Sequence, residues 1–386
     1  FRRVLFRSRD ENEVCTVGKA ESNTSRTVGA VKAASTASPA SAKRRVTLRD
    51  VAQTAGVSLK TASNVINGSG RMTDETRAKV EAVIKDLGYR VNVAARNLNR
   101  DHTGFITLAV PSLTPPYLAE LANRTIDAAR QRDYSVYVTT YAEGSAKGAR
   151  DLLKNFNSTV SDGMILSMSE VEDISPEDLK VDFPLVIVGA RTTWGVADHV
   201  TPDDVAAAAT ASGYLYDRGS SRLAVVGARG DYDAAALLQA VEGNAQLRLR
   251  GVIEETRRRG LELDPHLIGN TAQDWTIGAG ARVTQRLIDS GVPFDGVVAF
   301  NDQLAIGALT ALRTAGYEVP AQVQVIGFDN NEEAPYLQIP LTTMDSRLDW
   351  TAPTAVDRIL GRIAGDISKP ELLTAESQVI ARASTR

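Results

Sequence analysis

The sequence has few of the side chains that build covalent cross-links and metal sites. Its 386 residues include one cysteine, Cys15, and three histidines, at positions 102, 199 and 266. A single cysteine cannot form a disulfide within the chain, and the histidines do not have the spacing of metal ligands. The phosphate-binding pattern G-x-x-x-x-G-K-[ST] is missing as well. We therefore expect no enzyme active site, no bound metal and no cofactor.

Long apolar stretches are also lacking. No run approaches the roughly 18 apolar residues that span a membrane, and residues 1–10 alternate arginine with apolar residues instead of forming a continuous apolar segment. We therefore expect neither a secretion signal nor a membrane anchor, and a cytoplasmic location. Hydrophobic residues still make up 43% of the chain, enough to build the two or three domains expected at this length.

Charge is distributed unevenly, although the net charge of the chain is only −3. Residues 43–100 contain twelve Lys/Arg against five Asp/Glu, a net charge of +7, whereas residues 101–386 carry a net charge of −13. A cationic segment attracts a polyanion such as DNA because neutralised phosphates release their counterions. On charge alone, a merely solvated basic face explains the segment equally well.

Three short helices are predicted within residues 43–90, after a Ser-, Thr- and Ala-rich leader at 1–42 that we expect to be disordered. Gly56 permits a tight turn after the first helix, and Ser58 is placed to cap the second. A third helix is expected after Thr73. Two helices joined by such a turn form a helix-turn-helix, whose second helix presents its outward face to the major groove of DNA. The alternative is a two-helix piece of an all-α scaffold, which the basic charge disfavours.

Beyond residue 100 the chain has an α/β pattern, in which apolar runs alternate with amphipathic helices. Such alternation is typical of doubly wound parallel sheets with helices on both faces. Strands are predicted at 105–110, 134–140, 164–166, 185–188, 223–226, 297–300 and 323–327. Helices are predicted at 116–132, 146–156, 205–218, 276–290, 303–315 and 350–364. With about 280 residues this body is expected to form two lobes, with a ligand cleft at the carboxyl ends of the strands.

Several motifs of the basic segment occur together in one known family. They lie at 46–52, 55–58, 65–68, 73–77 and 87–89. With these motifs, residues 46–98 resemble the headpiece and hinge of LacI/GalR (lactose-repressor) family transcriptional regulators. The resemblance implies a DNA-binding headpiece at 43–90 and a hinge helix with its linker at 91–102.

The resemblance also implies roles for single residues of the headpiece and hinge. The base-reading residues are Leu59, Lys60 and Asn64. The residues that position the DNA through its phosphates are Thr47, Ser58, Thr61, Ser63, Asn67 and Thr73. The hinge residues that contact the minor groove are Asn92, Ala95 and Leu98, with Leu98 as an apolar wedge. The alternative for Leu98 is a linker residue that packs on the body.

Residues 103–386 are similar to the periplasmic-binding-protein-like core of the same family, most clearly at 300–302, 325–330, 341–344 and 379–385. The resemblance implies an effector-binding and dimerisation domain, with a first lobe of about 103–200 plus 346–370 and a second of about 201–345 plus 371–386. Its expected effector-binding residues are Tyr117, Arg191, Arg248, Trp275, Asn301 and Asp329.

The chemistry of these residues suits a sugar. Asp329 accepts hydrogen bonds from vicinal hydroxyls, Arg248 and Asn301 donate them, and Trp275 offers an apolar plate. Each has a purely structural alternative: packing for Trp275, an ion pair for Arg248 and a turn cap for Asp329. This sequence also departs from the family, because Gly189 stands where some members have an acid and the stretch 228–246 is longer than usual.

These features predict a sequence-specific DNA-binding transcription regulator, a repressor by family precedent. We expect its operator affinity to be controlled by a small molecule, with a sugar as the expected class. We expect a homodimer on a pseudo-palindromic operator, because one headpiece buries too little surface for high specificity. One alternative is a sugar-binding transport receptor without DNA function, and another is an architectural DNA-binding protein without an effector cleft.

Overall fold

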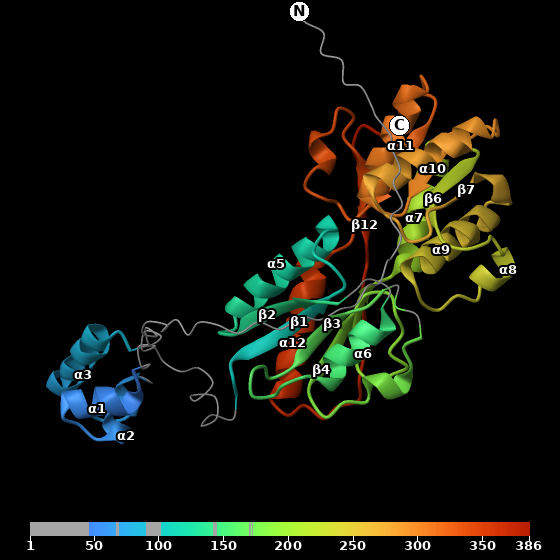
Figure 1. The fold of residues 1–386 in the computed structure, drawn as a ribbon. Helices are drawn as coiled ribbons and strands as arrows, with labels where there is room; N and C mark the ends of the chain where they lie inside the picture. Colours follow the sequence, from blue (N-terminus) through green and yellow to red (C-terminus); the bar gives the residue numbers. More distant parts are fainter. Residues whose placement is uncertain (1–45, 67–68, 90–101, 142–144, 170, 172) are drawn as a thin grey trace, which may run out of the picture. The chain divides into compact units, whose positions relative to one another are not determined.

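The computed structural model describes residues 46–66, 69–89, 102–141, 145–169, 171 and 173–386 (Figure 1). The chain forms two compact units, which divide between Val91 and Asn92. Several expectations lie outside the described residues: the leader at 1–42, the expected phosphate contact Asn67 and the expected hinge residues Asn92, Ala95 and Leu98. No helix in the described part of the chain combines the length and the apolar character that crossing a membrane requires.

The headpiece contains the three predicted helices. They are α1 (Leu48–Ala55), α2 (Leu59–Ile66) and α3 (Asp74–Leu87). Gly56 ends α1 in the left-handed region at φ 64°, which a residue without Cβ adopts at little cost, and it thereby produces the tight turn. Val51, Val65 and Val80, one from each helix, are at most 6% exposed and form the centre of the core. The helix-turn-helix prediction is confirmed.

The body contains two six-stranded sheets. The first has the order β11-β5-β4-β3-β1-β2 and the second the order β12-β10-β9-β8-β6-β7. The first consists of β1 (Phe105–Val110), β2 (Ser135–Thr140), β3 (Met164–Ser167), β4 (Leu185–Val188), β5 (Asp198–Pro202) and β11 (Leu372–Ala375). The second consists of β6 (Leu223–Ala228), β7 (Ile268–Asn270), β8 (Gly296–Ala299), β9 (Gln324–Phe328), β10 (Thr342–Asp345) and β12 (Gln378–Ile380). Within the described residues, the strands pair in parallel except for β10 with β12.

Helices cover both faces of the first sheet because alternate strand residues point to opposite sides. On one face, Ile165 and Val186 pack with α5 (Pro116–Arg130) and α12 (Leu348–Ile363). On the other face, the next residue of each strand, Leu166 and Ile187, packs with α6 (Ala146–Lys154). The short 3-10 helix η1 (Pro176–Leu179) adjoins α6. The predicted parallel sheet buried on both faces is confirmed in this lobe.

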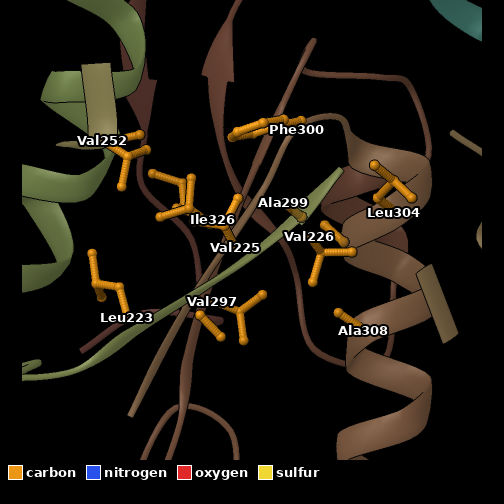
Figure 2. Close-up of a cluster of buried hydrophobic side chains, with 14 of the residues drawn as sticks. Leu223, Val225, Val226, Val252, Val297, Ala299, Phe300, Leu304, Ala308 and Ile326 are labelled. Atoms are coloured by element: carbon orange, nitrogen blue, oxygen red, sulfur yellow. The ribbon is translucent and has the colours of Figure 1, made fainter. Parts of the chain in front are cut away.

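The second lobe repeats this three-layer plan. Its helices are α7 (Asp204–Asp217), α8 (Ala234–Leu237), α9 (Asn244–Arg258), α10 (Ile277–Asp289) and α11 (Asp302–Thr314), with the 3-10 helices η2 (Pro265–Leu267) and η3 (Ala334–Tyr336). Figure 2 shows Val252 of α9 and Leu304 of α11 on opposite sides of the strands that carry Val225 and Val297. α7 packs with α9, and α10 packs with α11.

The chain crosses between the lobes three times, and one crossing differs from the expected boundaries. Residues 371–386 were all expected in the second lobe, which is wrong for β11 (Leu372–Ala375). This strand pairs with β5 of the first sheet, with Leu372 opposite His199, so that the chain returns to the second sheet only at β12. β11 is largely exposed at the sheet edge, and Leu372 is 63% exposed, so its sequence carries no buried pattern that would assign it to a lobe.

Candidate functional site

A cavity of about 510 Å³ lies between the two lobes of the body. Its walls come from segments at the carboxyl ends of strands in both sheets, including Pro111 after β1, Gly189 after β4 and Asp329 after β9. In parallel α/β sheets this edge is where the strand ends and helix starts leave room for a ligand. The expected position of the cleft is therefore confirmed.

Arg248 is a buried charge on the wall of this cavity. Its Nε atom donates to Asp204 Oδ1 at 2.7 Å and its Nη1 atom to the carbonyl of Phe300, and the two charged residues are 5% and 2% exposed. The guanidinium carbon lies 4.4 Å from the centre of the Phe328 ring and 5.6 Å from that of Trp275. Paired and stacked in this way, the guanidinium is a rigid donor in a water-poor site.

Asp329 lines the cavity directly after β9 and adopts a φ of 102°. Its Oδ1 atom accepts a hydrogen bond from Ser346 Oγ at 3.0 Å. Burial raises the pKa of the Asp329 carboxyl, while the charge of Arg248 and the bond from Ser346 oppose that rise. The hydrogen bond from Ser346 therefore fixes the Asp329 carboxyl as an acceptor on the wall of the cavity that Arg248 also lines.

Asp302 supports the turn that carries Asp329, a role that the sequence interpretation did not assign. Its carboxylate accepts from Asn331 N at 2.8 Å and from Thr343 Oγ1 at 2.6 Å, and its side chain is fully buried. Burial raises the pKa of Asp302 well above its ordinary range, and the nearby charge of Asp329 adds to the rise. The only signal for it in the sequence was its place in the 300–302 motif.

Asn301 and Trp275 line the cavity, but the structure already uses their polar atoms. Asn301 Oδ1 accepts from Leu304 N at 2.8 Å as the N-cap of α11, and its Nδ2 donates to Trp275 O at 3.1 Å. Trp275 Nε1 donates to Gly227 O at 3.1 Å. The packing alternative for Trp275 therefore holds alongside its expected role, because only its ring is left to offer a ligand. Asn301 orders the start of α11 and the loop of Trp275.

Tyr117 lies near the start of α5 and lines the cavity from the first lobe. Burial raises the pKa of its hydroxyl, and the charges of Asp329 and Asp204 raise it further. The hydroxyl is therefore neutral at physiological pH. It brings a donor and acceptor from the lobe opposite to Arg248 and Asp329.

Arg191 is not among the residues that line the cavity, so the structure does not place it with the other expected effector residues. Its Nη1 atom lies 3.1 Å from Glu242 Oε1 instead. Polar residues that the sequence interpretation missed do line the cavity, among them Arg229, Asn244 and Gln273. Arg229 follows β6 by one residue, so its place after a strand was the available signal. Asn244 begins α9, a helix that was not predicted because its buried face includes polar and charged residues.

In the headpiece, the residues expected to read bases lie on the outer side of α2. Ala62 and Val65 are 0% and 6% exposed and face the core, whereas Leu59 is 49% exposed. At 100° per residue, Lys60 and Asn64 fall on the side opposite to Ala62 and Val65. Lys60 is exposed and Asn64 partly buried. The geometry leaves this face available to a major groove.

Three residues expected to contact phosphates are helix caps. Thr47 Oγ1 accepts from Asp50 N at 3.3 Å, Ser58 Oγ from Thr61 N at 3.0 Å and Thr73 Oγ1 from Thr76 N at 3.3 Å. A capped N-terminus also presents backbone N–H groups and a positive dipole end, which suit a phosphate. Ser63 and Thr61 are partly buried on α2. Within the described residues, no cluster of three His, Cys, Asp or Glu forms a metal site.

Comparison with known proteins assigns both units. Residues 47–92 match the family "Bacterial regulatory proteins, lacI family", and residues 213–385 match a periplasmic binding protein-like domain. The HTH-type transcriptional regulator AscG of Escherichia coli (strain K12) is 30% identical over 351 residues, 86% of this chain and 96% of that protein. The ribose operon repressor of the same strain is 29% identical over 319 residues, 82% of this chain and 93% of that protein.

A solved structure agrees with these sequence relatives. A LacI-type transcription regulator from Bifidobacterium animalis subsp. lactis DSM 10140 has 32% sequence identity and a TM-score of 0.69, and the match covers 73% of this chain and 99% of that one. The similarity thus extends through the body as well as the headpiece. This chain belongs to the lacI family of bacterial regulatory proteins and is a DNA-binding transcription regulator.

Proposed function

We propose that this regulator is a repressor whose operator affinity is set by a sugar bound between the lobes of its body. The observation that carries the proposal is the convergence of Tyr117, Arg248 and Asp329 on one cavity wide enough for a small molecule. A neutral hydroxyl, a fixed cation and a fixed carboxyl offer donors and acceptors to neighbouring hydroxyl groups, and the Trp275 ring offers an apolar surface to a sugar ring face. The name of the ribose operon repressor, a relative over most of the chain, fits this ligand class.

For DNA we propose that Leu59, Lys60 and Asn64 read bases in the major groove. Thr47, Ser58, Thr61, Ser63, Asn67 and Thr73 are then the phosphate contacts, and Asn92, Ala95 and Leu98 the minor-groove contacts. The exposed position of the first two base-reading residues on α2 supports the assignment. Arg191 does not line the cavity, so the effector site proposed here leaves it out.

We further propose a domain division into a leader (1–42), a headpiece (43–90), a hinge with linker (91–102) and a body (103–386). The working form is then a cytoplasmic homodimer on a pseudo-palindromic operator, since two headpieces double the contacted surface. A sugar that binds closed lobes more tightly than open ones would shift the paired hinges. Such coupling typically changes affinity by about 1–3 kcal/mol.

The test is a fluorescence anisotropy titration of the full chain onto a duplex from the region upstream of its own gene. A panel of sugars is screened first by thermal shift, and the sugar that stabilises the protein most is added to the titration. We expect tighter binding than to a scrambled duplex at about 0.15 M salt, and a change in affinity when the sugar is present. Equal binding to both duplexes would contradict sequence-specific recognition of this region, and an affinity unchanged by the sugar would contradict control by that sugar.

Asp329→Asn separates the two halves of this proposal. The variant keeps the size of the side chain but replaces the carboxylate that accepts from sugar hydroxyls. We expect unchanged operator affinity in the absence of sugar and no response to the sugar that shifts the wild type. A normal response in this variant would remove Asp329 from the site.

A further inference from the structure

Two loops from different lobes meet beside the effector cavity. One follows β4 in the first lobe and carries Ala190 and Arg191, and the other precedes α9 in the second lobe and carries Glu242 and Gly243. Gly243 N donates to Ala190 O at 3.0 Å, and Arg191 Nη1 lies 3.1 Å from Glu242 Oε1. One backbone hydrogen bond and one ion pair therefore join the lobes at this point.

This junction is directly connected to the ligand-binding walls on both sides. In the first lobe Ala190 follows Gly189, which lines the cavity. In the second lobe Gly243 is the N-cap of α9, whose residues Asn244 and Arg248 also line it. A change in the junction therefore moves the start of the helix that carries Arg248 relative to the first lobe.

Each of the two loops has a glycine in the left-handed region next to the point where they meet. Gly189 has a φ of 105°, and a Cβ at this position would lie 2.3 Å from the carbonyl oxygen of Met168. Gly243 has a φ of 85°. Both values belong to the left-handed region, which residues with a side chain rarely adopt. The glycine that replaces an acid at 189 and the long stretch 228–246 thus meet at the same place.

The ion pair is shielded but incompletely satisfied. The side chains of Arg191 and Glu242 are 15% and 26% exposed, so solvent screens their attraction only in part. Arg191 Nε and Glu242 Oε2 are buried and make no hydrogen bond in this arrangement. The ion pair is therefore monodentate and not bidentate. Breaking it costs less free energy than breaking a fully hydrogen-bonded buried pair.

We propose that Arg191 and Glu242 form an inter-lobe clasp that sets how readily the effector cavity closes, an inference that rests on the proposed function. The clasp joins the two lobes independently of the effector, because neither residue lines the cavity. A ligand that binds the closed form then has less conformational free energy to supply, and its apparent affinity rises with the closed fraction. Arg191 and Glu242 are positioning residues in this scheme and do not touch the effector.

The Gly243 amide gives a direct readout, because it is bonded across the junction only while the lobes are joined there. We would follow its hydrogen–deuterium exchange in the full, ligand-free chain, in the wild type and in Arg191→Gln, Glu242→Gln and the double variant. We expect about tenfold faster exchange in each single variant, which corresponds to about 1.4 kcal/mol of lost closure. The double variant should exchange no faster than either single variant, because both remove one interaction.

Two further proteins complete the experiment. Lys180→Gln breaks the exposed pair with Glu177, whose atoms lie 2.8 Å apart, and should leave Gly243 unchanged. The charge-swapped protein Arg191→Glu with Glu242→Arg should restore slow exchange. Faster amide exchange in β6, a buried strand of the second lobe, would show that a single variant destabilises the lobe itself. In that case the charge-swapped protein decides. Slow exchange of its Gly243 amide supports the clasp, and fast exchange overturns it.

Unchanged exchange at Gly243 in both single variants, or additive effects in the double variant, would overturn the clasp. The measurement uses neither sugar nor DNA. A negative result therefore removes the clasp and leaves the proposed function in place, whereas failure of the operator titration leaves the exchange result standing.

Discussion

Arg248 of α9 and Asp204 of α7 form a 2.7 Å ion pair inside the second lobe, next to the effector cavity. Asp204 also accepts from Asn244 Nδ2 at 2.9 Å, so one carboxylate holds two residues of the cavity wall. Arg248 was expected from the resemblance to bind the effector, with an ion pair as its structural alternative. The structure shows that Arg248 makes a buried ion pair and also lines the cavity.

Replacing Asp204 by Asn should both destabilise the protein and weaken effector binding. The change leaves the buried guanidinium of Arg248 without its counter-charge, which typically costs about 3–5 kcal/mol. The free energy of unfolding from a urea titration measures the loss. Asp217→Asn on the same helix is the matched control, because Asp217 pairs with Arg259 but is 62% exposed, and such pairs contribute about 0–1 kcal/mol. Equal losses in the two variants would contradict the buried role of Asp204.

Replacing Asn64 by Ala should reduce specific DNA binding more than non-specific binding. A bidentate contact to a base edge is worth about 1–3 kcal/mol of discrimination, whereas contacts to phosphates add affinity for any sequence. Anisotropy titrations with the operator and with a scrambled duplex, over a range of salt, separate the two effects. An equal loss on both duplexes would place Asn64 among the phosphate contacts.

His199 should make the stability of the protein depend on pH. Burial lowers the pKa of His199, although the bond of its Nε2 atom to Gly189 O, at 2.6 Å, opposes the shift. A pKa lower in the folded than in the unfolded state means that folding favours the neutral ring. The stability from His199 is therefore fully present above about pH 6.5, the unfolded value, and is lost as the pH falls below it.

The variant His199→Gln tests this prediction, since its amide also donates to Gly189 O. Burial raises the pKa values of Asp302 and Asp329, so these groups change stability in the opposite direction on acidification. They are common to both proteins, and the difference between wild type and variant isolates His199. We expect the unfolding free energy of the wild type, relative to His199→Gln, to fall between pH 7.5 and pH 5. A difference independent of pH would show that His199 does not titrate in this range.

Two glycines inside helices should respond in opposite ways to alanine. A Cβ on Gly251 of α9 would lie 2.2 Å from the carbonyl oxygen of Val205, so α7 and α9 would have to separate. We expect Gly251→Ala to destabilise the protein by about 1–3 kcal/mol. A Cβ on Gly361 of α12 meets nothing within 4 Å, and Gly361→Ala should stabilise the helix by up to about 1 kcal/mol. Thermal unfolding of both variants checks the signs, and a stabilised Gly251→Ala would rule out the close helix contact.

Strong local patterns made much of the fold predictable. The buried runs that form β1, β4, β6 and β9 are apolar and short, and they lie close to their predicted bounds. β5 was missed because its sequence, DHVTP, contains polar residues and a proline although every residue of it is buried. α9 was missed for a related reason, since its buried face includes Arg248, Glu255 and Thr256. Polar groups that find partners only in the folded chain leave no apolar pattern in the sequence.

The sequence by itself determined the family, the helix-turn-helix and five of the six cavity residues expected from the resemblance, because these depend on local spacing and on motifs. Only the tertiary structure decided that Arg191 pairs with Glu242 and that β11 belongs to the first sheet. Both outcomes depend on contacts between segments about 50 and 170 residues apart, whose free energy is not encoded in either segment alone.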